Sequence, residues 1–321
     1  MTTRSVLPYL VLFGGVLVAA SASILIRLAQ EQGVPSTTIA AGRLGIAALI
    51  LLPLALRRAL PELRRLGRRD LLLGVGSGVV LAVHFDAWIS SLAYTSVASS
   101  AALVATNPLW VALASVLLFR ERLDGPTILG IVLTVGGSAL IGLSDTGAHA
   151  APNALLGDGL ALLGALAASA YFLIGRELRG RLSLLAYIWL VYTSAALVLL
   201  VVALAVGWGS VAVPPGQTAP LGIPLPAWLC LLGLALGPQL LGHTAFNWSL
   251  RHLSATFVAI AILGEPIGSA LLALLIFGES FAALQLLGFL LLLCGIATAA
   301  LVERRDTRDR TAEPASPALA E

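Results

Sequence analysis

Ten long apolar segments constrain this chain more than any other feature. An α-helix rises 1.5 Å per residue, so about 20 residues cross a hydrocarbon core about 30 Å thick. Only 11% of the residues are charged and the mean hydropathy is +0.98, whereas soluble domains carry about 25% charged residues. The sequence therefore predicts an all-α membrane protein with ten transmembrane helices. We expect these helices over residues 8–28, 36–56, 71–93, 98–119, 126–144, 157–175, 184–207, 227–249, 255–277 and 282–302.

The arginines indicate how the predicted helices are oriented. All 19 basic residues are arginines, and 17 of them fall in loops or chain ends on one side of the predicted bundle. They are Arg4, six arginines in 57–69, Arg120 and Arg122, three in 176–181, Arg251 and four in 304–310. The positive-inside rule places this side, with both termini, in the cytoplasm. We therefore expect a multi-pass protein of a bacterial inner membrane. The net charge of +3 is spread over short loops and does not indicate a nucleic-acid partner.

One pattern occurs twice in the chain, with an offset of 158 residues. Aligning residues 92–137 with 250–295 gives 13 identical positions. They include Pro108 with Pro266, Phe119 with Phe277, Glu121 with Glu279, Gly130 with Gly288 and Gly137 with Gly295. Small residues allow helices to approach closely in lipid, and the two glutamates, at helix ends, are interpreted as architectural.

The repeat predicts two units of five helices each, at residues 1–145 and 146–302. Because five is odd, the second unit enters the membrane from the opposite side. Inverted repeats are typical of secondary transporters, whose substrate site lies near mid-membrane between the copies. The N-terminus, with Arg4 and Ala20-Ser21-Ala22 around an apolar run, imitates a signal peptide, but the five-helix unit requires it as a first helix. Residues 303–321 alternate charge with Pro, Ala and Ser, which predicts a disordered cytoplasmic tail.

These features resemble a known family. Arg43 in the second predicted helix, Pro108 in the fourth, and Glu265-Pro266 in the ninth are similar to the EamA-type branch of the drug/metabolite transporter superfamily. The closing phrase Phe277-Gly-Glu279, followed by two glycines, matches as well, and the resemblance covers residues 8–302. It implies ten helices around a central cavity and the export of small metabolites such as amino acids.

Polar residues on two predicted helices are candidates for lining that cavity. Gln239, His243 and Asn247 follow i, i+4, i+8 spacing, so they share one stripe, and such a stripe avoids lipid. His84 and Trp88 share a face of the third helix, and the repeat pairs His84 with His243 within one residue. The alternatives are hydrogen bonds between helices for the stripe and a packed, hydrogen-bonded histidine for His84.

Prolines inside the apolar segments predict breaks, because proline removes a helical N–H group. Pro108 and Pro266 share one repeat position and are expected to break their helices beside the cavity. Pro238 is expected to bend the eighth helix and to free backbone carbonyls. Asn107 and Trp110 flank Pro108, and we expect both in the cavity, with Trp110 stacking on the substrate.

Three charged residues lie inside the predicted membrane core, where a charge costs about 2.5–3.5 kcal/mol on insertion scales and usually marks function. Arg43 and Asp86 both lie about 10 Å below the outer ends of their helices, by helix rise. They predict a structural ion pair, and the competing interpretation is that Arg43 binds a substrate carboxylate. Burial disfavours the charged form of a carboxyl group, so Glu265 could exchange a proton and couple export to the proton gradient. Alternatively, Glu265 stays protonated or accepts hydrogen bonds beside Pro266.

The sequence carries no enzyme signature beside these residues. It has no lysine for a phosphate-binding loop and no Cys/His ligand spacing, and Cys230 and Cys294 lie within apolar runs as packing residues. We expect neither a cofactor nor a metal.

The leading prediction is a secondary-active exporter of small metabolites that works by alternating access, with the lipid bilayer and a small-molecule substrate as partners and protons as the candidate coupling ion. A passive facilitator and, with less support, a membrane-embedded enzyme using buried His and Glu are the alternatives.

Overall fold

The computed structural model describes residues 6–94, 100, 103–104, 106–120, 122–144, 153–207, 220–277 and 283–312, and within these ranges it contains helices and no strand. Seven helices in this part are long and apolar enough to cross a membrane. Three shorter apolar helices, Asn107–Leu118, Gly125–Leu140 and Leu286–Val302, accompany them. The prediction of an all-α membrane protein is therefore confirmed.

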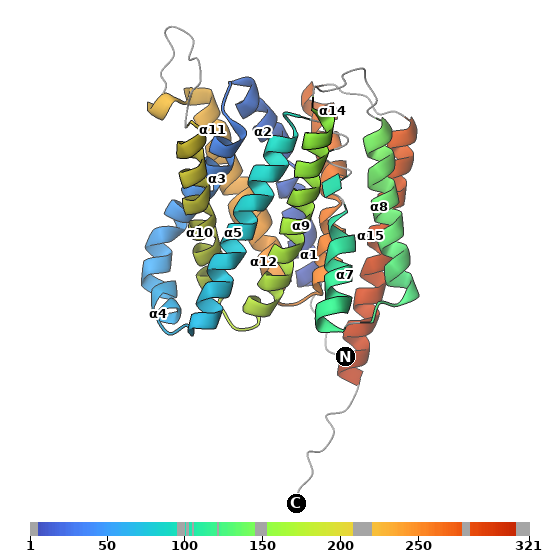
Figure 1. Cartoon of the computed structure of the whole chain (residues 1–321). Helices are drawn as coiled ribbons and strands as arrows, with labels where there is room; N and C mark the ends of the chain where they lie inside the picture. Colours follow the sequence, from blue (N-terminus) through green and yellow to red (C-terminus); the bar gives the residue numbers. More distant parts are fainter. Residues whose placement is uncertain are drawn as a thin grey trace, which may run out of the picture.

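Figure 1 labels the helices along the chain. In chain order they are α1 (Leu7–Ala19), α2 (Ala22–Glu31), α3 (Ser36–Leu54), the π-helix η1 (Ala55–Ala59), α4 (Leu60–Leu63), α5 (Arg68–Ser91), α7 (Asn107–Phe119), α8 (Gly125–Ser144), α9 (Ala154–Arg179), α10 (Leu184–Val206), the 3₁₀ turn η2 (Pro220–Gly222), α11 (Leu225–Leu234), the π-helix η3 (Ala235–His243), α12 (Thr244–Ser249), α13 (Ala255–Ile262), α14 (Glu265–Phe277) and α15 (Ala283–Ala312).

Each predicted apolar segment coincides with one helix or with consecutive helices. The first segment is divided between α1 and α2, and the ninth between α13 and α14. The fourth segment was expected to begin at residue 98, which lies outside the described residues; its described helix, α7, begins at Asn107. Glu121 and Glu279 also lie outside the described residues.

The last helix is longer than expected. α15 continues to Ala312, so residues 303–312 of the expected disordered tail are helical, and residues 313–321 lie outside the described part. Alternating charge without proline is compatible with a helix that continues into water, and the first proline of the tail is Pro314. The predicted boundary at residue 302 therefore marks where the apolar sequence ends and not where the helix ends.

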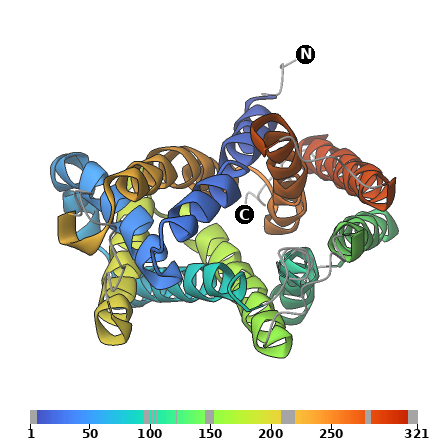
Figure 2. The same cartoon turned by 90° about the horizontal axis from the view of Figure 1, so that it is seen from above.

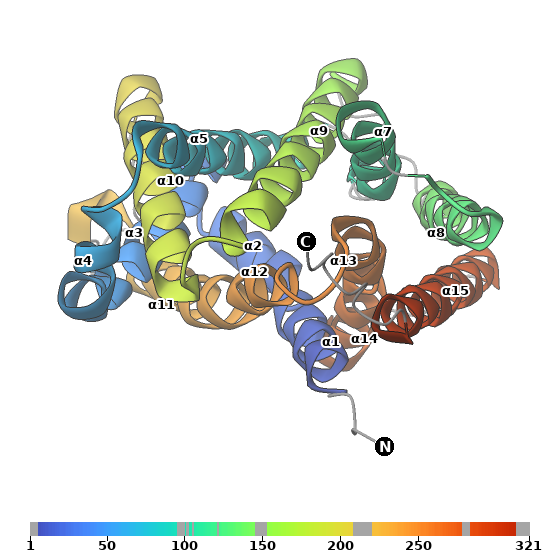
Figure 3. The ribbon, with the colours of Figure 1, turned by 90° about the horizontal axis from the view of Figure 1, so that it is seen from below.

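The helices form a bundle whose basic connections gather at one end. Figure 1 shows the start of α1, the end of α15, and the connections α4–α5, α9–α10 and α12–α13 at the lower end. Seen from above and below, α8 and α15 lie side by side at one edge of the bundle, while α3, α4 and α10 lie at the other (Figures 2 and 3). The main helix pairs are α8 with α15, α5 with α9 and α3 with α10.

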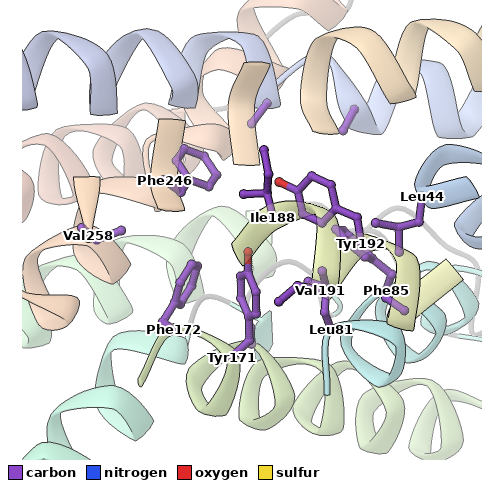
Figure 4. Packing of buried hydrophobic residues seen from close by; sticks show 14 of the residues in the cluster. Leu44, Leu81, Phe85, Tyr171, Phe172, Ile188, Val191, Tyr192, Phe246 and Val258 are labelled. Carbon is purple, nitrogen blue, oxygen red and sulfur yellow. The ribbon is translucent and has the colours of Figure 1, made fainter. Parts of the chain in front are cut away.

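The bundle is apolar on both its inner and its outer surfaces. Aromatic and aliphatic side chains from α3, α5, α9, α10 and α12 converge in the core (Figure 4). Many large apolar side chains are also exposed, which suits lipid and not water, because lipid tails solvate apolar groups. Examples are Leu10, Leu17, Leu72, Leu117, Leu155, Val201 and Leu275.

Candidate functional site

An interruption in the ninth predicted helix brings a carboxylate to a helix start. Residues 263–264 separate α13 from α14. Glu265 and Pro266 are the first two residues of α14, as Asn107 and Pro108 are the first two residues of α7. Proline suits the first turn of a helix, because the N–H group that it lacks would have no helical partner there. Both repeat prolines therefore begin a helix and do not kink one.

The eighth predicted helix contains a π-helical segment, η3, which spans Ala235–His243 and includes Pro238. π-helical turns are rare and occur frequently at functional sites. Gln239 and His243 belong to η3 and Asn247 to α12. Gln239 and Asn247 are fully buried, whereas His243 is half-buried. Two of the three residues of the polar stripe thus lie on the segment with irregular backbone.

Arg43 is a buried cation in the middle of α3, with 1% of its surface exposed. Its guanidinium carbon Cζ lies 4.1 Å from the centroid of the Phe85 ring, a contact worth about 2 kcal/mol when desolvated. None of its three guanidinium nitrogens has a hydrogen-bond partner among the described residues. Arg179 is equally buried but has partners. Its Nε donates to the backbone carbonyl of Asn247 at 3.1 Å, and its Nη1 donates to the backbone carbonyl of Leu182. The fold therefore uses the donors of Arg179 and leaves those of Arg43 available.

The predicted ion pair between Arg43 and Asp86 is wrong. Asp86 accepts a hydrogen bond from the hydroxyl of Thr37 at 2.6 Å, and Arg43 bonds to none of the described residues. Successive helix residues are rotated by about 100°, so Phe85 meets Arg43 while the next residue turns away. Equal depth in neighbouring helices does not bring two side chains together when the helix rotation separates them.

Phe85 also contacts two imidazoles. Its ring centroid lies 4.9 Å from that of His84 and 5.1 Å from that of His243. His84 stacks on Trp88 at 6.1 Å, and its Nδ1 donates to the carbonyl of Gly164 at 2.9 Å. His84 therefore has the satisfied hydrogen bond of a packed histidine, whereas the buried Nδ1 of His243 has no partner within the described part of the chain.

The two amides of the stripe have different surroundings. Asn247 accepts from the hydroxyl of Tyr171 at 2.8 Å and donates to the carbonyl of His243 at 2.9 Å. Figure 4 shows Tyr171 and Tyr192 among the buried residues of the core. The hydroxyl of Tyr192 lies 3.4 Å from the backbone carbonyl of Gln239. The side-chain nitrogen and oxygen of Gln239 are buried and bond to no described residue. Asn247 thus joins α9 and α12, whereas the hydrogen-bonding groups of the Gln239 amide are unused within the described residues.

Glu265 is half-buried, and its charge interacts with that of Arg43. No salt bridge joins the two side chains, since the guanidinium has no partner among the residues described. The positive end of the α14 dipole also favours a carboxylate at this position. Arg43 and Glu265 therefore influence each other through their electrostatic interaction and not through a direct bond.

Asn107 and Trp110 form bonds elsewhere. The hydroxyl of Ser169 donates to the side-chain oxygen of Asn107 at 3.1 Å, and the indole N–H of Trp110 donates to the hydroxyl of Thr106 at 2.9 Å. Asn107 is buried and Trp110 half-buried. Within the described residues these bonds do not connect them to the group around Arg43, so their place in a substrate cavity stays a prediction.

The group that the structure assembles consists of Arg43, Phe85, Gln239, His243 and Glu265, which we call the Arg43 cluster. Sequence reasoning missed Phe85, because an apolar ring gives no signal until the rotation of its helix is known. It also placed Arg179 in a basic loop, although α9 continues to that residue. Among the described residues no group of three His, Cys, Asp or Glu could hold a metal ion. The cluster offers buried hydrogen-bond donors and acceptors, together with one guanidinium and one carboxyl group.

The apolar helices and the buried polar cluster place the chain among polytopic helical membrane proteins. Comparison with known proteins identifies its family. The profile of the EamA-like transporter family matches residues 6–143 and again residues 155–301. The chain therefore belongs to the EamA-like transporter family, and the predicted resemblance is confirmed.

Individual relatives have names that give no substrate. The chain is 27% identical over 201 residues to the uncharacterized transporter YetK of Bacillus subtilis (strain 168), an alignment that spans 57% of this chain and 60% of that relative. It is 24% identical over 262 residues to an uncharacterized transporter of Clostridium kluyveri, with 78% of each chain covered. One crystal structure is similar with a TM-score of 0.72 and 19% identity, over 93% of this chain and 98% of that one. This last similarity supports the fold alone.

Proposed function

We propose that the protein is a secondary-active transporter that exports small metabolites, amino acids or related compounds, across a bacterial inner membrane. In this proposal ten helices cross the membrane as two inverted units, residues 1–145 and 146–302, with both termini in the cytoplasm. The two units rock about a central site by alternating access. The observation that carries the proposal is the Arg43 cluster: α3 and α5 come from the first unit, and η3 and α14 come from the second.

Contacts between α8 and α15 support the inverted repeat. A Cβ atom on Gly137 would lie 2.6 Å from the carbonyl oxygen of Gly288, and one on Gly130 would lie 3.2 Å from the carbonyl oxygen of Gly295. Gly130 is the repeat partner of Gly288, and Gly137 that of Gly295. The contacts therefore exchange partners, as they do across a two-fold axis.

Other helix pairs also show a reciprocal arrangement of the two units. The third helix of the first unit, α5, packs on α9, the first helix of the second unit. Reciprocally, η3 and α12, which belong to the third helix of the second unit, pack on α1, the first helix of the first unit. The family profile also matches the chain twice, once within each unit. These features favour a pseudo-two-fold axis in the membrane plane.

Polar contacts at the basic end join the two units. Glu62 accepts from the backbone N–H of Ser183 at 2.7 Å, and Arg181 forms a salt bridge with Asp70 at 3.1 Å. Both contacts are exposed, and exposed ion pairs contribute about 0–1 kcal/mol. In an alternating-access cycle they are suited to closing the cytoplasmic end reversibly.

Metabolite profiling tests the proposal without a known substrate. Cells that overproduce the protein are compared with cells that lack it, in the medium and in the cytoplasm. Export predicts that at least one small metabolite rises in the medium and falls in the cytoplasm of the overproducing cells. Unchanged profiles would contradict it. Collapse of the proton gradient then separates a coupled carrier, which stops, from a passive facilitator, which continues.

A further inference from the structure

Exposed arginines gather where the first unit connects α3 to α5, at the basic end of the bundle. They lie in η1, directly after α4 and in the first turn of α5, and α4 stands at the edge of the bundle in Figure 3. The Arg43 cluster includes none of them. We call this group the arginine surface, and its members are Arg57, Arg58, Arg64, Arg65, Arg68 and Arg69.

The acidic residues of the same stretch do not neutralise these arginines. Glu62 accepts from the backbone N–H of Ser183 at 2.7 Å, and Asp70 forms its salt bridge with Arg181 at 3.1 Å. Both carboxylates are therefore bonded to the second unit. Of the arginine surface only Arg69 reaches an acidic group within the described part of the chain, at 4.0 Å, and the other five arginines have no ion pair there.

Packing on α10 turns the first arginine pair outward. Ala55 and Ala59 are fully buried in a small apolar cluster with Ala186 of α10, so they fix the inner side of η1. Residues 56–58, which lie between them, are exposed. The guanidinium groups of this pair therefore face the surroundings of the protein and not another helix.

Apolar side chains border the arginines on the outer surface. Leu54 is 42% exposed and Leu56 is 49% exposed, just before Arg57 in the chain. On α5, Leu72 is 60% exposed and follows Arg68 by four residues, which places the two on one face about one turn apart. Leucines exposed on a membrane bundle contact acyl chains. The arginines therefore lie where the hydrocarbon core meets the lipid headgroups.

The position of Arg68 and Arg69 in the first turn of α5 also favours a bound anion. The N-terminus is the positive end of a helix dipole, where anions stabilise the helix and cations do not. Neighbouring arginines repel one another as well, because like charges gathered on a surface repel. A phosphate group offsets both effects, and the planar guanidinium binds its oxygens in bidentate fashion.

The charge of the surface decides between kinds of phospholipid. A zwitterionic headgroup carries a cation beside its phosphate, which the unpaired arginines repel, whereas an anionic headgroup carries none. Clusters of arginine or lysine beside a transmembrane helix attract anionic lipids for this reason.

We propose that the arginine surface binds anionic phospholipids of the phosphatidylglycerol type. Their phosphates lie on the arginines and their acyl chains lie along Leu54, Leu56 and Leu72. The inference requires only that the basic end of the bundle lies at a membrane surface, and it does not depend on which compound is transported.

Fluorescence quenching in vesicles tests this inference, because Trp189 packs against the alanine cluster behind the surface. The full-length protein is reconstituted into unlabelled phosphatidylcholine with increasing fractions of phosphatidylglycerol whose acyl chains carry bromine, which quenches nearby tryptophan. A second series contains brominated phosphatidylcholine instead, and subtraction of the W189F signal isolates Trp189. We expect half-maximal quenching at a mole fraction of phosphatidylglycerol about threefold or more below that of phosphatidylcholine. Equal curves for the two lipids would overturn the proposal.

Substitutions assign the preference to the arginine surface. The first variant replaces four of its arginines and is expected to bring the two curves together: R57Q, R58Q, R64Q and R65Q. The matched control removes four arginines at the same end of the bundle, from the part of α15 where acidic residues alternate with them: R304Q, R305Q, R308Q and R310Q. The control should keep the preference. Equal loss in both variants would show attraction to general surface charge, and the proposal would fall.

Two further arms keep the outcome decisive. If the fourfold variant does not fold, the pair R64Q and R65Q decides, because both side chains are exposed directly after α4; a wild-type preference in this pair would overturn the proposal. Soluble glycerol phosphate has the headgroup without acyl chains and should not relieve the quenching at millimolar concentration. Relief would indicate a site for free phosphate, and the assignment to lipid would be wrong.

Discussion

Replacing Gln239 with methionine should make the protein more stable and less active. Gln239 is fully buried in η3, and neither atom of its amide has a partner among the described residues. Methionine has nearly the same length and flexibility without the polar atoms, and volume-conserving changes are tolerated best in cores. The substitution therefore removes a buried polar group that the fold does not satisfy.

The expected magnitude follows from that missing bond. An unsatisfied buried polar group costs about 1–3 kcal/mol, so Q239M should raise the free energy of unfolding by about that amount. The matched control is N247L on the same predicted helix. Asn247 is equally buried, but it bonds to Tyr171 and to the carbonyl of His243. N247L leaves those groups unpaired and should destabilise the protein by about 1–3 kcal/mol.

Unfolding of the two purified variants in the same detergent, followed by tryptophan fluorescence, measures both shifts. The reasoning predicts opposite signs, with the midpoint of Q239M above and that of N247L below the wild type. Transport should fall in Q239M despite its higher stability, because the amide is expected to contact substrate. If Q239M is destabilised as much as N247L, the Gln239 amide is bonded in the folded protein and the reasoning is refuted.

Three further predictions concern packing, pairing and coupling. G137A should lower the Tm, because the added Cβ meets a carbonyl oxygen at 2.6 Å, whereas G136A, with open space around it, should not; thermal unfolding compares them, and equal midpoints would refute the contact. Adding D86A to R43A should not restore expression or stability, because the two residues are not paired; recovery in the double variant, measured by size-exclusion yield, would revive the ion pair. E265Q should flatten the pH dependence of transport, and an unchanged pH profile would remove Glu265 as a proton carrier.

The sequence predicted the helices well for a physical reason. A segment surrounded by lipid must satisfy its backbone internally and present apolar side chains, so length and hydropathy identify it. The expected segments 36–56, 184–207 and 255–277 therefore agree with observed helices within a few residues, apart from short irregular stretches. Hydropathy does not predict how far a helix continues beyond its apolar segment, and the extension of α15 to Ala312 was therefore missed.

The candidate site was predictable only where spacing along one helix determines it. The i, i+4 spacing placed Gln239 and His243 on one stripe, and both belong to the Arg43 cluster. Contacts between helices depend on how each helix is rotated, and sequence depth does not determine rotation. The expected partner of Arg43 was therefore wrong by one residue: Phe85 contacts it and Asp86 does not.

Breaks in helices were predicted in position but not in form. Pro266 predicted an interruption, and the structure separates α13 from α14 just before it. Pro238 predicted an irregularity in the eighth helix, and the structure has a π-helical segment there. Proline shows that a regular hydrogen bond is missing, but neighbouring helices decide how the backbone adapts.

Uptake of labelled amino acids by everted membrane vesicles tests the central claim most directly. In everted vesicles the cytoplasmic face is outside, so an exporter carries its substrate inward. Vesicles containing the wild-type protein, supplied with a mixture of labelled amino acids and an energy source, should accumulate at least one of them faster than vesicles lacking the protein. Vesicles with the R43Q variant should not. Identical uptake in all three preparations would contradict the account.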